Sequence, residues 1–140
     1  MIVLDTSVTM AWFFPYETSP YADAVLDYLH SSRALVPALW PFEVANVLVI
    51  GERRQRATAM QSDQFVQLLT TLPIDIEPRA LTDLPLTLLP LARRLTLSAY
   101  DAAYLDLALR LELPLATLDT RLISAAKSAG VTLFAPLKAS

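Results

Sequence analysis

Short apolar runs alternate along the chain with longer segments in which apolar residues recur at helical spacing. The short runs at 2–4, 34–36, 74–77, 115–118 and 131–134 predict β-strands. The longer segments predict helices. The first follows the polar triplet 5–7 and extends to residue 12. The others lie over 20–29, from 41 to the basic cluster at 53–56, over 59–72, within 81–97, over 99–112 and from 120 to Gly130. This alternation predicts an α/β fold, a three-layer α/β/α sandwich around a mainly parallel central sheet.

Several predicted helix ends carry residues that stabilise them. Ser19 is suited to capping one helix, and Pro20 fits its first turn. Ser98 can cap a later helix, and Gly130 can end the last one. These signals support the predicted boundaries.

The composition indicates one folded unit. The chain has 140 residues, the usual size of one domain, and no internal repeat, low-complexity tract or charge block, so we expect a single domain over 1–140. Hydrophobic residues make up 54% of it and charged residues only 18%, which is more apolar than an ordinary soluble domain. We expect part of the apolar surplus to lie at an interface.

The most apolar stretch, 34–50, is just long enough to raise the question of a membrane span. Pro37, Pro41, Glu43 and Asn46 interrupt it, and a carboxylate at its middle would be costly in lipid. The apolar run after Met1 has no basic flank or small-residue cleavage site, and the chain contains no cysteine. We therefore expect a cytoplasmic protein that does not cross a membrane.

The net charge of −3 does not favour a broad phosphate-binding surface. Any nucleic-acid contact must therefore be local. Arg53, Arg54 and Arg56 cluster at the end of a predicted helix. A solvated helix end, favoured by the helix dipole, explains this cluster at least as well as a phosphate contact does.

Four carboxylates stand where a ligand site is expected. Asp5 and Asp119 follow the first and fourth predicted strands, and ligands of open α/β sheets bind just beyond the carboxyl ends of the strands. Glu43 and Asp101 lie in the first turn of predicted helices. Any one of them alone is more simply explained as a helix cap or dipole partner. Four in largely apolar segments indicate a shared site, because unpaired carboxylates are costly there.

Carboxylates that share a site repel one another, by roughly 4 kcal/mol for a pair about 4 Å apart at an effective dielectric constant of about 20. Such a cluster needs a divalent cation or shared protons. The chain has no cysteine, and its one histidine, His30, lies away from these motifs, so Mg²⁺ or Mn²⁺ is favoured over Zn²⁺. A cation of this kind indicates phosphoryl chemistry, in which an activated water attacks phosphorus.

The motifs that carry these acids resemble those of a known family. In chain order they are Ile2-Val3-Leu4-Asp5-Thr6-Ser7, Pro41-Phe42-Glu43-Val44-Ala45-Asn46-Val47-Leu48, Tyr100-Asp101-Ala102-Ala103-Tyr104-Leu105 and Leu115-Ala116-Thr117-Leu118-Asp119. Over nearly the whole chain they resemble the PIN domains, most closely the VapC-like toxins of toxin–antitoxin pairs. The resemblance implies a Mg²⁺- or Mn²⁺-dependent endoribonuclease that cleaves single-stranded RNA, acts as a homodimer and is inhibited by a small cognate antitoxin.

The same resemblance assigns roles to individual residues. The acidic quartet that binds metal and carries out catalysis would be Asp5, Glu43, Asp101 and Asp119. Ser7 and Thr117 match the family's polar supporting positions. Many members carry another acid shortly after the fourth, but positions 120–122 supply none. The number of metal ions is therefore left open.

Other candidate residues have simpler explanations. Asp106 lies about 140° around its helix from Asp101, so we interpret it as a surface residue, and we interpret His30 as a helix-end residue. Four aromatic residues flank the acidic motifs, and for each of them packing in the core or a dimer is favoured over stacking on RNA bases. These residues are Trp12, Tyr16, Trp40 and Tyr100.

Apolar stripes on the helices that start near 41 and 59 are expected to serve mainly the core. They comprise Val47, Leu48, Phe65, Leu68 and Leu69. A groove left between these helices would suit an amphipathic helix of an antitoxin, which we state as a hypothesis.

Two alternatives to a nuclease remain. A phosphatase of the haloacid-dehalogenase type also places an aspartate after an N-terminal strand, but that family requires Asp-x-Asp and residue 7 is serine. A catalytically silent PIN-like module that binds RNA or a protein is the second alternative. The intact set of four acids argues against it, and metal-dependent cleavage would exclude it.

Overall fold

The computed structural model describes residues 1–79 and 81–136, and a four-stranded sheet lies at its centre. The strands pair in parallel in the order β3-β2-β1-β4. They are β1 (Ile2–Leu4), β2 (Ala34–Val36), β3 (Ile74–Ile76) and β4 (Leu115–Ala116).

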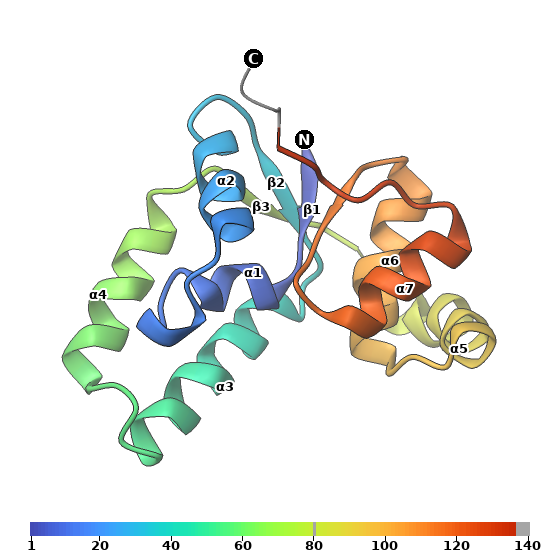
Figure 1. Ribbon diagram of the computed structural model, residues 1–140. Helices are drawn as coiled ribbons and strands as arrows, with labels where there is room; N and C mark the ends of the chain where they lie inside the picture. The colour runs from blue at the N-terminus through green and yellow to red at the C-terminus, as the bar shows by residue number, and fades with distance from the viewer. Residues whose placement is uncertain (80, 137–140) are drawn as a thin grey trace.

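Helices cover the sheet on both sides (Figure 1), with α2 and α4 on one side and α5, α6 and α7 on the other. The helices are α1 (Thr6–Ala11), α2 (Pro20–Tyr28), α3 (Trp40–Arg53), α4 (Ala59–Thr70), α5 (Leu84–Leu95), α6 (Ala99–Leu111) and α7 (Thr120–Ala129), with short 3-10 turns at Pro15–Glu17 and Leu81–Asp83. The predicted α/β/α sandwich with a parallel sheet is confirmed.

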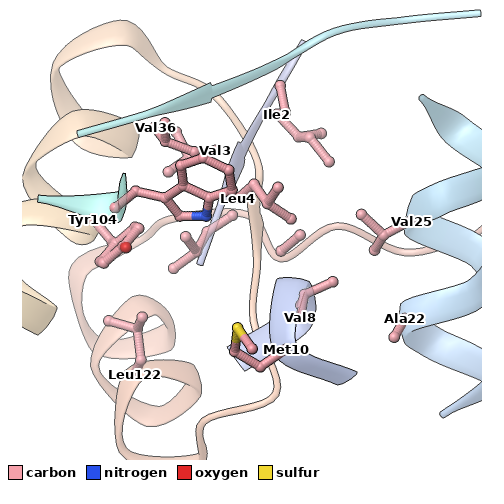
Figure 2. Close-up of a cluster of buried hydrophobic side chains, with 14 of the residues drawn as sticks. Ile2, Val3, Leu4, Val8, Met10, Ala22, Val25, Val36, Tyr104 and Leu122 are labelled. Atoms are coloured by element: carbon pink, nitrogen blue, oxygen red, sulfur yellow. The ribbon is translucent and has the colours of Figure 1, made fainter. Parts of the chain in front are cut away.

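Strand β1 forms the middle of the core. Its three residues are at most 1% exposed, which explains why they read as a continuous apolar run: a strand covered on both faces has no polar side. Figure 2 shows that helices on both sides contribute to this core, through Val8 of α1, Val25 of α2, Tyr104 of α6 and Leu122 of α7. Each large apolar side chain buried in this way contributes about 1.5–3 kcal/mol.

The strand order changes direction at β1. The chain places β2 and β3 on one side of β1 and returns to place β4 on the other. In open parallel sheets, such a change of direction leaves a crevice at the carboxyl ends of the two strands. Val3 pairs with Leu115 and Leu4 with Ala116, so Asp5 and Thr117, which follow these pairs, start beside each other.

The predicted helix caps are present. The hydroxyl of Ser19 accepts a hydrogen bond from the amide of Ala22 at the start of α2, and that of Ser98 accepts one from Asp101 at the start of α6. Gly130 ends α7 at φ 77°, a left-handed conformation in which glycine is least strained.

The predicted strand at 131–134 is present only as a single parallel β-bridge to β4. In the part of the chain that the structure describes, only Leu133 makes a β-bridge there, with Leu115. The amide of Val131 still donates to the carbonyl of Ala126 (2.9 Å) and completes the end of α7. Extended pairing can start only after this turn, and Pro136 follows soon, so the segment is too short for a full strand.

Asp106 is buried, which corrects its interpretation as a surface residue. It is 5% exposed, and its Oδ2 accepts hydrogen bonds from Arg79 and Arg110, each 2.8 Å long. Arg79 also donates to Thr87, and Arg110 to Glu77, both at 2.7 Å. This ion network joins the segment after β3 to α5 and α6.

None of the helices within residues 1–79 and 81–136 is long and apolar enough to cross a membrane. The apolar stretch 34–50 instead contains β2, a turn and most of α3.

Candidate active site

Asp5 lies directly after β1, where the sequence predicts a ligand site. Its amide donates to the carbonyl of Ala116 (3.0 Å), so the pairing of β1 with β4 continues to this residue. Its carboxylate then caps α1 by accepting a hydrogen bond from the amide of Ser7 (3.4 Å). A strand that turns at once into a helix therefore holds the Asp5 side chain at the carboxyl edge of the sheet.

Two hydroxyl groups orient the Asp5 carboxylate. Its Oδ2 accepts hydrogen bonds from Ser7 Oγ (2.6 Å) and from Thr117 Oγ1 (2.8 Å). Ser7 Oγ in turn accepts one from the amide of Leu118 (2.9 Å), which ties α1 to the segment after β4. These are the contacts expected of the supporting residues. All of the hydrogen bonds found for this carboxylate in the described residues go to Oδ2, and none involves Oδ1.

Burial raises the pKa of Asp5 above its ordinary value of 3.8. The hydrogen bonds from Ser7 and Thr117 lower this pKa, and the charge of Asp119 raises it again. Asp5 is 5% exposed, and no salt bridge within residues 1–79 and 81–136 includes it. A buried carboxylate without a cationic partner favours a bound cation or a proton.

Glu43 faces the site from the first turn of α3. Its Oε1 accepts hydrogen bonds from Tyr104 (2.5 Å) and from Thr6 Oγ1 (3.1 Å). Burial raises the pKa of Glu43, the bonds from Tyr104 and Thr6 lower it, and the charges of Asp5 and Asp101 raise it. The net result is a pKa above the ordinary value of a glutamate.

Asp101 enters the site from the first turn of α6. Burial raises its pKa, and the charges of Asp119 and Asp5 raise it further. The hydroxyl of Ser98 and the charge of Arg121 lower this pKa, but the net shift is upward.

Asp119 caps α7 at the carboxyl end of β4. Its Oδ1 accepts hydrogen bonds from the amides of Arg121 (2.9 Å) and Leu122 (3.1 Å). Its own amide donates to Thr117 Oγ1 (3.0 Å), which also contacts Asp5. Thr117 therefore connects the two aspartates that follow the strands.

Electrostatic interactions link the four predicted acids, although none is found between Asp119 and Glu43 in the described residues. Asp119 acts on Asp5 and Asp101, and Asp5 and Asp101 act on Glu43, in each case by raising a pKa. Residues 1–79 and 81–136 nevertheless contain no group of three or more acidic, histidine or cysteine side chains placed so that together they could hold a metal ion.

The donor set fits a hard divalent cation that keeps part of its water shell. In each of Asp5, Glu43 and Asp119, one carboxylate oxygen accepts all of the hydrogen bonds found for that carboxylate in the described residues. Within the same residues, the other oxygen accepts none. Mg²⁺ is commonly held by one or two carboxylates plus waters, so it does not require a preformed cage. Oxygen donors alone also match its preference.

Three side chains at the site were not predicted from the sequence. Thr6 and Tyr104 contact Glu43, and the exposed Arg121 is close enough to Asp101 to lower its pKa. Thr6 is the residue after Asp5, and Tyr104 lies one helical turn after Asp101. Their positions inside two acidic motifs were the only signal in the sequence.

The aromatic residues near the motifs divide into two groups. Trp40 is 8% exposed and Trp12 is partly buried, and the indole N–H of each donates a hydrogen bond inside the protein, so core packing is confirmed for both. Tyr16 and Tyr100 are 60% and 66% exposed. His30 lies just after α2 and contacts Asp27 (3.4 Å), as expected of a helix-end residue.

Sequence and structure together define the family. The model of the PIN domain matches residues 2–128. This match, the parallel α/β/α sandwich and the acids at the strand ends show that the chain belongs to the PIN-domain family. No curated protein matches the sequence.

Solved structures from several organisms share the fold. The chain is similar to PAE2754 from Pyrobaculum aerophilum, with a TM-score of 0.66 and 19% identity over 89% of this chain and 84% of that one. It is similar to a toxin–antitoxin complex from Klebsiella pneumoniae, with a TM-score of 0.60 and 18% identity over 86% of this chain and 88% of that one. FitAcB from Neisseria gonorrhoeae gives a TM-score of 0.53 and 22% identity over 97% and 98%.

Proposed function

We propose that this chain is a Mg²⁺- or Mn²⁺-dependent endoribonuclease that hydrolyses phosphodiester bonds of single-stranded RNA. The observation that carries the proposal is the state of Asp5. It is a buried carboxylate without a cationic partner in the described residues, held by two hydroxyl groups beside three further acids. Acids gathered in this way destabilise the free protein, so their presence at the sheet crevice favours a cation-binding role.

The acids and hydroxyls have distinct roles in this proposal. A bound divalent cation supplies positive charge that polarises the phosphate and assists attack by water. The residues that would hold it are Asp5, Glu43, Asp101 and Asp119, and one of them accepts a proton from the attacking water. Ser7 and Thr117 keep Asp5 in one orientation. By analogy with the family, the products end in a 5′-phosphate and a 3′-hydroxyl.

We further propose that the enzyme is the toxin of a type II toxin–antitoxin pair. The similar structure from Klebsiella pneumoniae is a toxin–antitoxin complex. The predicted groove between α3 and α4 has a volume of about 380 Å³ and is lined in part by Val44, Val66 and Leu69. Leu48 and Phe65 of the predicted stripes are buried, whereas Val66 at the groove is 43% exposed. The apolar face of an antitoxin helix would fit this groove.

The antitoxin proposal has a direct test. Co-expression with the adjacent reading frame should yield a stable complex that co-purifies. Val66→Glu should weaken this complex at least about 10-fold, because it buries a charge in the groove. Val49→Glu is the matched control, since Val49 is 38% exposed and does not line the groove. Recovery of the chain without any small partner would count against an antitoxin.

We also propose a homodimer. Two adjoining apolar hollows share Leu84, one beside Phe42 of α3 and the other along α5. Phe42 and Leu89, which line them, are 78% and 48% exposed. An apolar face of this kind is expected at an interface between subunits.

The nuclease proposal is tested by incubating a mixed pool of tRNA, rRNA and mRNA with antitoxin-free protein. Parallel reactions contain Mg²⁺, Mn²⁺ or EDTA, and a duplex RNA serves as the substrate control. We expect cleavage of single-stranded regions with either metal and none with EDTA. Failure of folded, metal-supplied protein to cut any RNA would instead favour a silent module that binds RNA or a protein.

Metal is expected to stabilise the protein most at neutral pH. The pKa values of Asp5, Glu43 and Asp101 are raised in the folded chain, so the folded state binds these protons more tightly than the unfolded state. The stability that they contribute is full below the ordinary pKa near 4 and is lost as the pH rises through the folded values. Mg²⁺ or Mn²⁺ should restore it by replacing the protons.

Thermal unfolding with Mn²⁺ and with EDTA measures this effect across pH. The rise in Tm caused by Mn²⁺ should be several degrees at about pH 7.5 and small at about pH 4.5. A rise that does not depend on pH would show that Mn²⁺ binds elsewhere.

A further inference from the structure

We infer that Tyr104 is a positioning residue that fixes the orientation of Glu43, and that Thr6 acts on Glu43 through Tyr104. This inference rests on the proposed function. The three side chains come from α6, α3 and α1 and form a triangle of close oxygen contacts. Tyr104 lies 2.5 Å from Glu43 Oε1 and 2.7 Å from Thr6 Oγ1, and Thr6 Oγ1 lies 3.1 Å from Glu43 Oε1.

The number of available protons indicates which group donates in each contact of this triangle. With Glu43 ionised, the two hydroxyl groups supply only two protons for three contacts. The two shortest contacts form a chain in which Thr6 donates to Tyr104 and Tyr104 donates to Glu43. The 3.1 Å contact between Thr6 and Glu43 is the longest of the three, so Glu43 receives only the weaker share of the Thr6 proton. Tyr104 is then the donor that holds Glu43, and Thr6 sets the direction of the Tyr104 hydroxyl.

The burial of Tyr104 protects its hydrogen bond to Glu43 from water. Its side chain is fully buried and lies in the core beside β1 (Figure 2). Water therefore has no access with which to replace its contact with Glu43. Both contacts of Glu43 use Oε1, and fixing Oε1 of a planar carboxylate also fixes where Oε2 points. Hydrogen bonds that orient a ligand in this way commonly affect metal affinity by about 10- to 100-fold.

The triangle also connects the elements that carry three of the four acids. Thr6 follows Asp5, Tyr104 lies one helical turn after Asp101, and Glu43 itself lies on α3. Loss of the Tyr104 hydroxyl therefore releases Glu43 and loosens its alignment with Asp5 and Asp101. A purely structural hydroxyl would affect unfolding but not the affinity for a cation.

The test measures Mn²⁺ binding to the metal-free, full-length protein by electron paramagnetic resonance, without RNA. Tyr104→Phe should weaken Mn²⁺ binding about 10-fold, and Thr6→Val should weaken it less. Tyr28→Phe is the matched control. It removes a phenol hydroxyl that contacts Ser32 and the N-terminal amine, each at 2.8 Å, at the opposite end of β1. This control should bind Mn²⁺ like the wild type.

A double-mutant cycle identifies Glu43 as the residue through which Tyr104 acts. In the Glu43→Gln background, Tyr104→Phe should cause little further loss of Mn²⁺ affinity. An equal loss in both backgrounds would overturn the inference. The inference would also be overturned if the wild type binds Mn²⁺ and Tyr104→Phe binds it with the same affinity. If the wild type itself binds no Mn²⁺, the proposed function fails first. If Tyr104→Phe does not fold, Thr6→Val decides by the same comparison.

Discussion

Asp5→Asn is expected to lower RNA cleavage by about 1,000-fold or more and, at the same time, to stabilise the metal-free protein. The amide is close in size to the carboxylate and can still accept hydrogen bonds from Ser7 and Thr117. It removes a charge that burial and Asp119 both disfavour. The free energy of unfolding in EDTA should rise on the order of 1 kcal/mol, because an unpaired buried charge is replaced by a neutral group.

Two measurements check this pair of effects. RNA cleavage is followed with Mg²⁺ for the wild type and the variant, and thermal unfolding is followed for both in EDTA at neutral pH. The Tm of the variant should be higher by roughly 3–4 °C, the shift expected for about 1 kcal/mol in a domain of this size. A variant that is both active and less stable would show that Asp5 is an ordinary structural residue.

Asp106→Asn is expected to have the opposite effects: it should destabilise the protein and leave RNA cleavage nearly unchanged. Asp106 is buried like Asp5, but it accepts hydrogen bonds from Arg79 and Arg110. Removing its charge leaves two arginines, whose side chains are 21% and 32% exposed, with weaker partners. Breaking a buried ion pair costs about 3–5 kcal/mol, and the partial exposure of both arginines reduces this to about 2–3 kcal/mol.

The stability of Asp106→Asn is measured by thermal or urea unfolding, and its activity is measured below its unfolding transition. The Tm should fall by roughly 7–10 °C, while cleavage per folded molecule stays within a few-fold of the wild type. A large loss of cleavage in protein shown to be folded would contradict a purely structural role for Asp106.

Much of the site could be predicted because it depends on local features of the sequence. An aspartate that follows a buried strand and caps the next helix lies at the sheet edge. This holds for Asp5, directly after β1, and for Asp119, which follows β4 after two intervening residues. Glu43 and Asp101 were also recognisable, because each lies in the first turn of a helix with clear start signals. Parallel pairing then brings these separate motifs together.

The interpretation of Asp106 failed because it assumed that α6 has an exposed face. Residues 102–108 are all buried, and α6 packs against β1, α5 and α7. A helix covered on several sides must bury a charged residue that falls within this stretch. The partners that compensate that charge, Arg79 and Arg110, become apparent only once the segment after β3 is placed.

Tyr104 shows a different limit of sequence reasoning. It stands inside one of the acidic motifs, and its ring is buried in the core. Its hydroxyl gains significance only from Thr6, which is 98 residues away in the chain, and from Glu43, which is 61 residues away. Contacts over such separations have no local signature. The strand predicted at 131–134 is shortened to one β-bridge for a similar reason: its apolar run was visible, but the hydrogen bond by which Val131 completes the end of α7 was not.

Cleavage of a labelled single-stranded RNA by three proteins, each with Mg²⁺ and with EDTA, tests the central claim most directly. The proteins are the wild type, Asp5→Asn and Asp106→Asn. We predict that the wild type and Asp106→Asn cut the RNA only with Mg²⁺, and that Asp5→Asn does not cut it at all. Equal cleavage by the wild type and Asp5→Asn, or cleavage that persists in EDTA, would contradict a metal-dependent ribonuclease built on these acids.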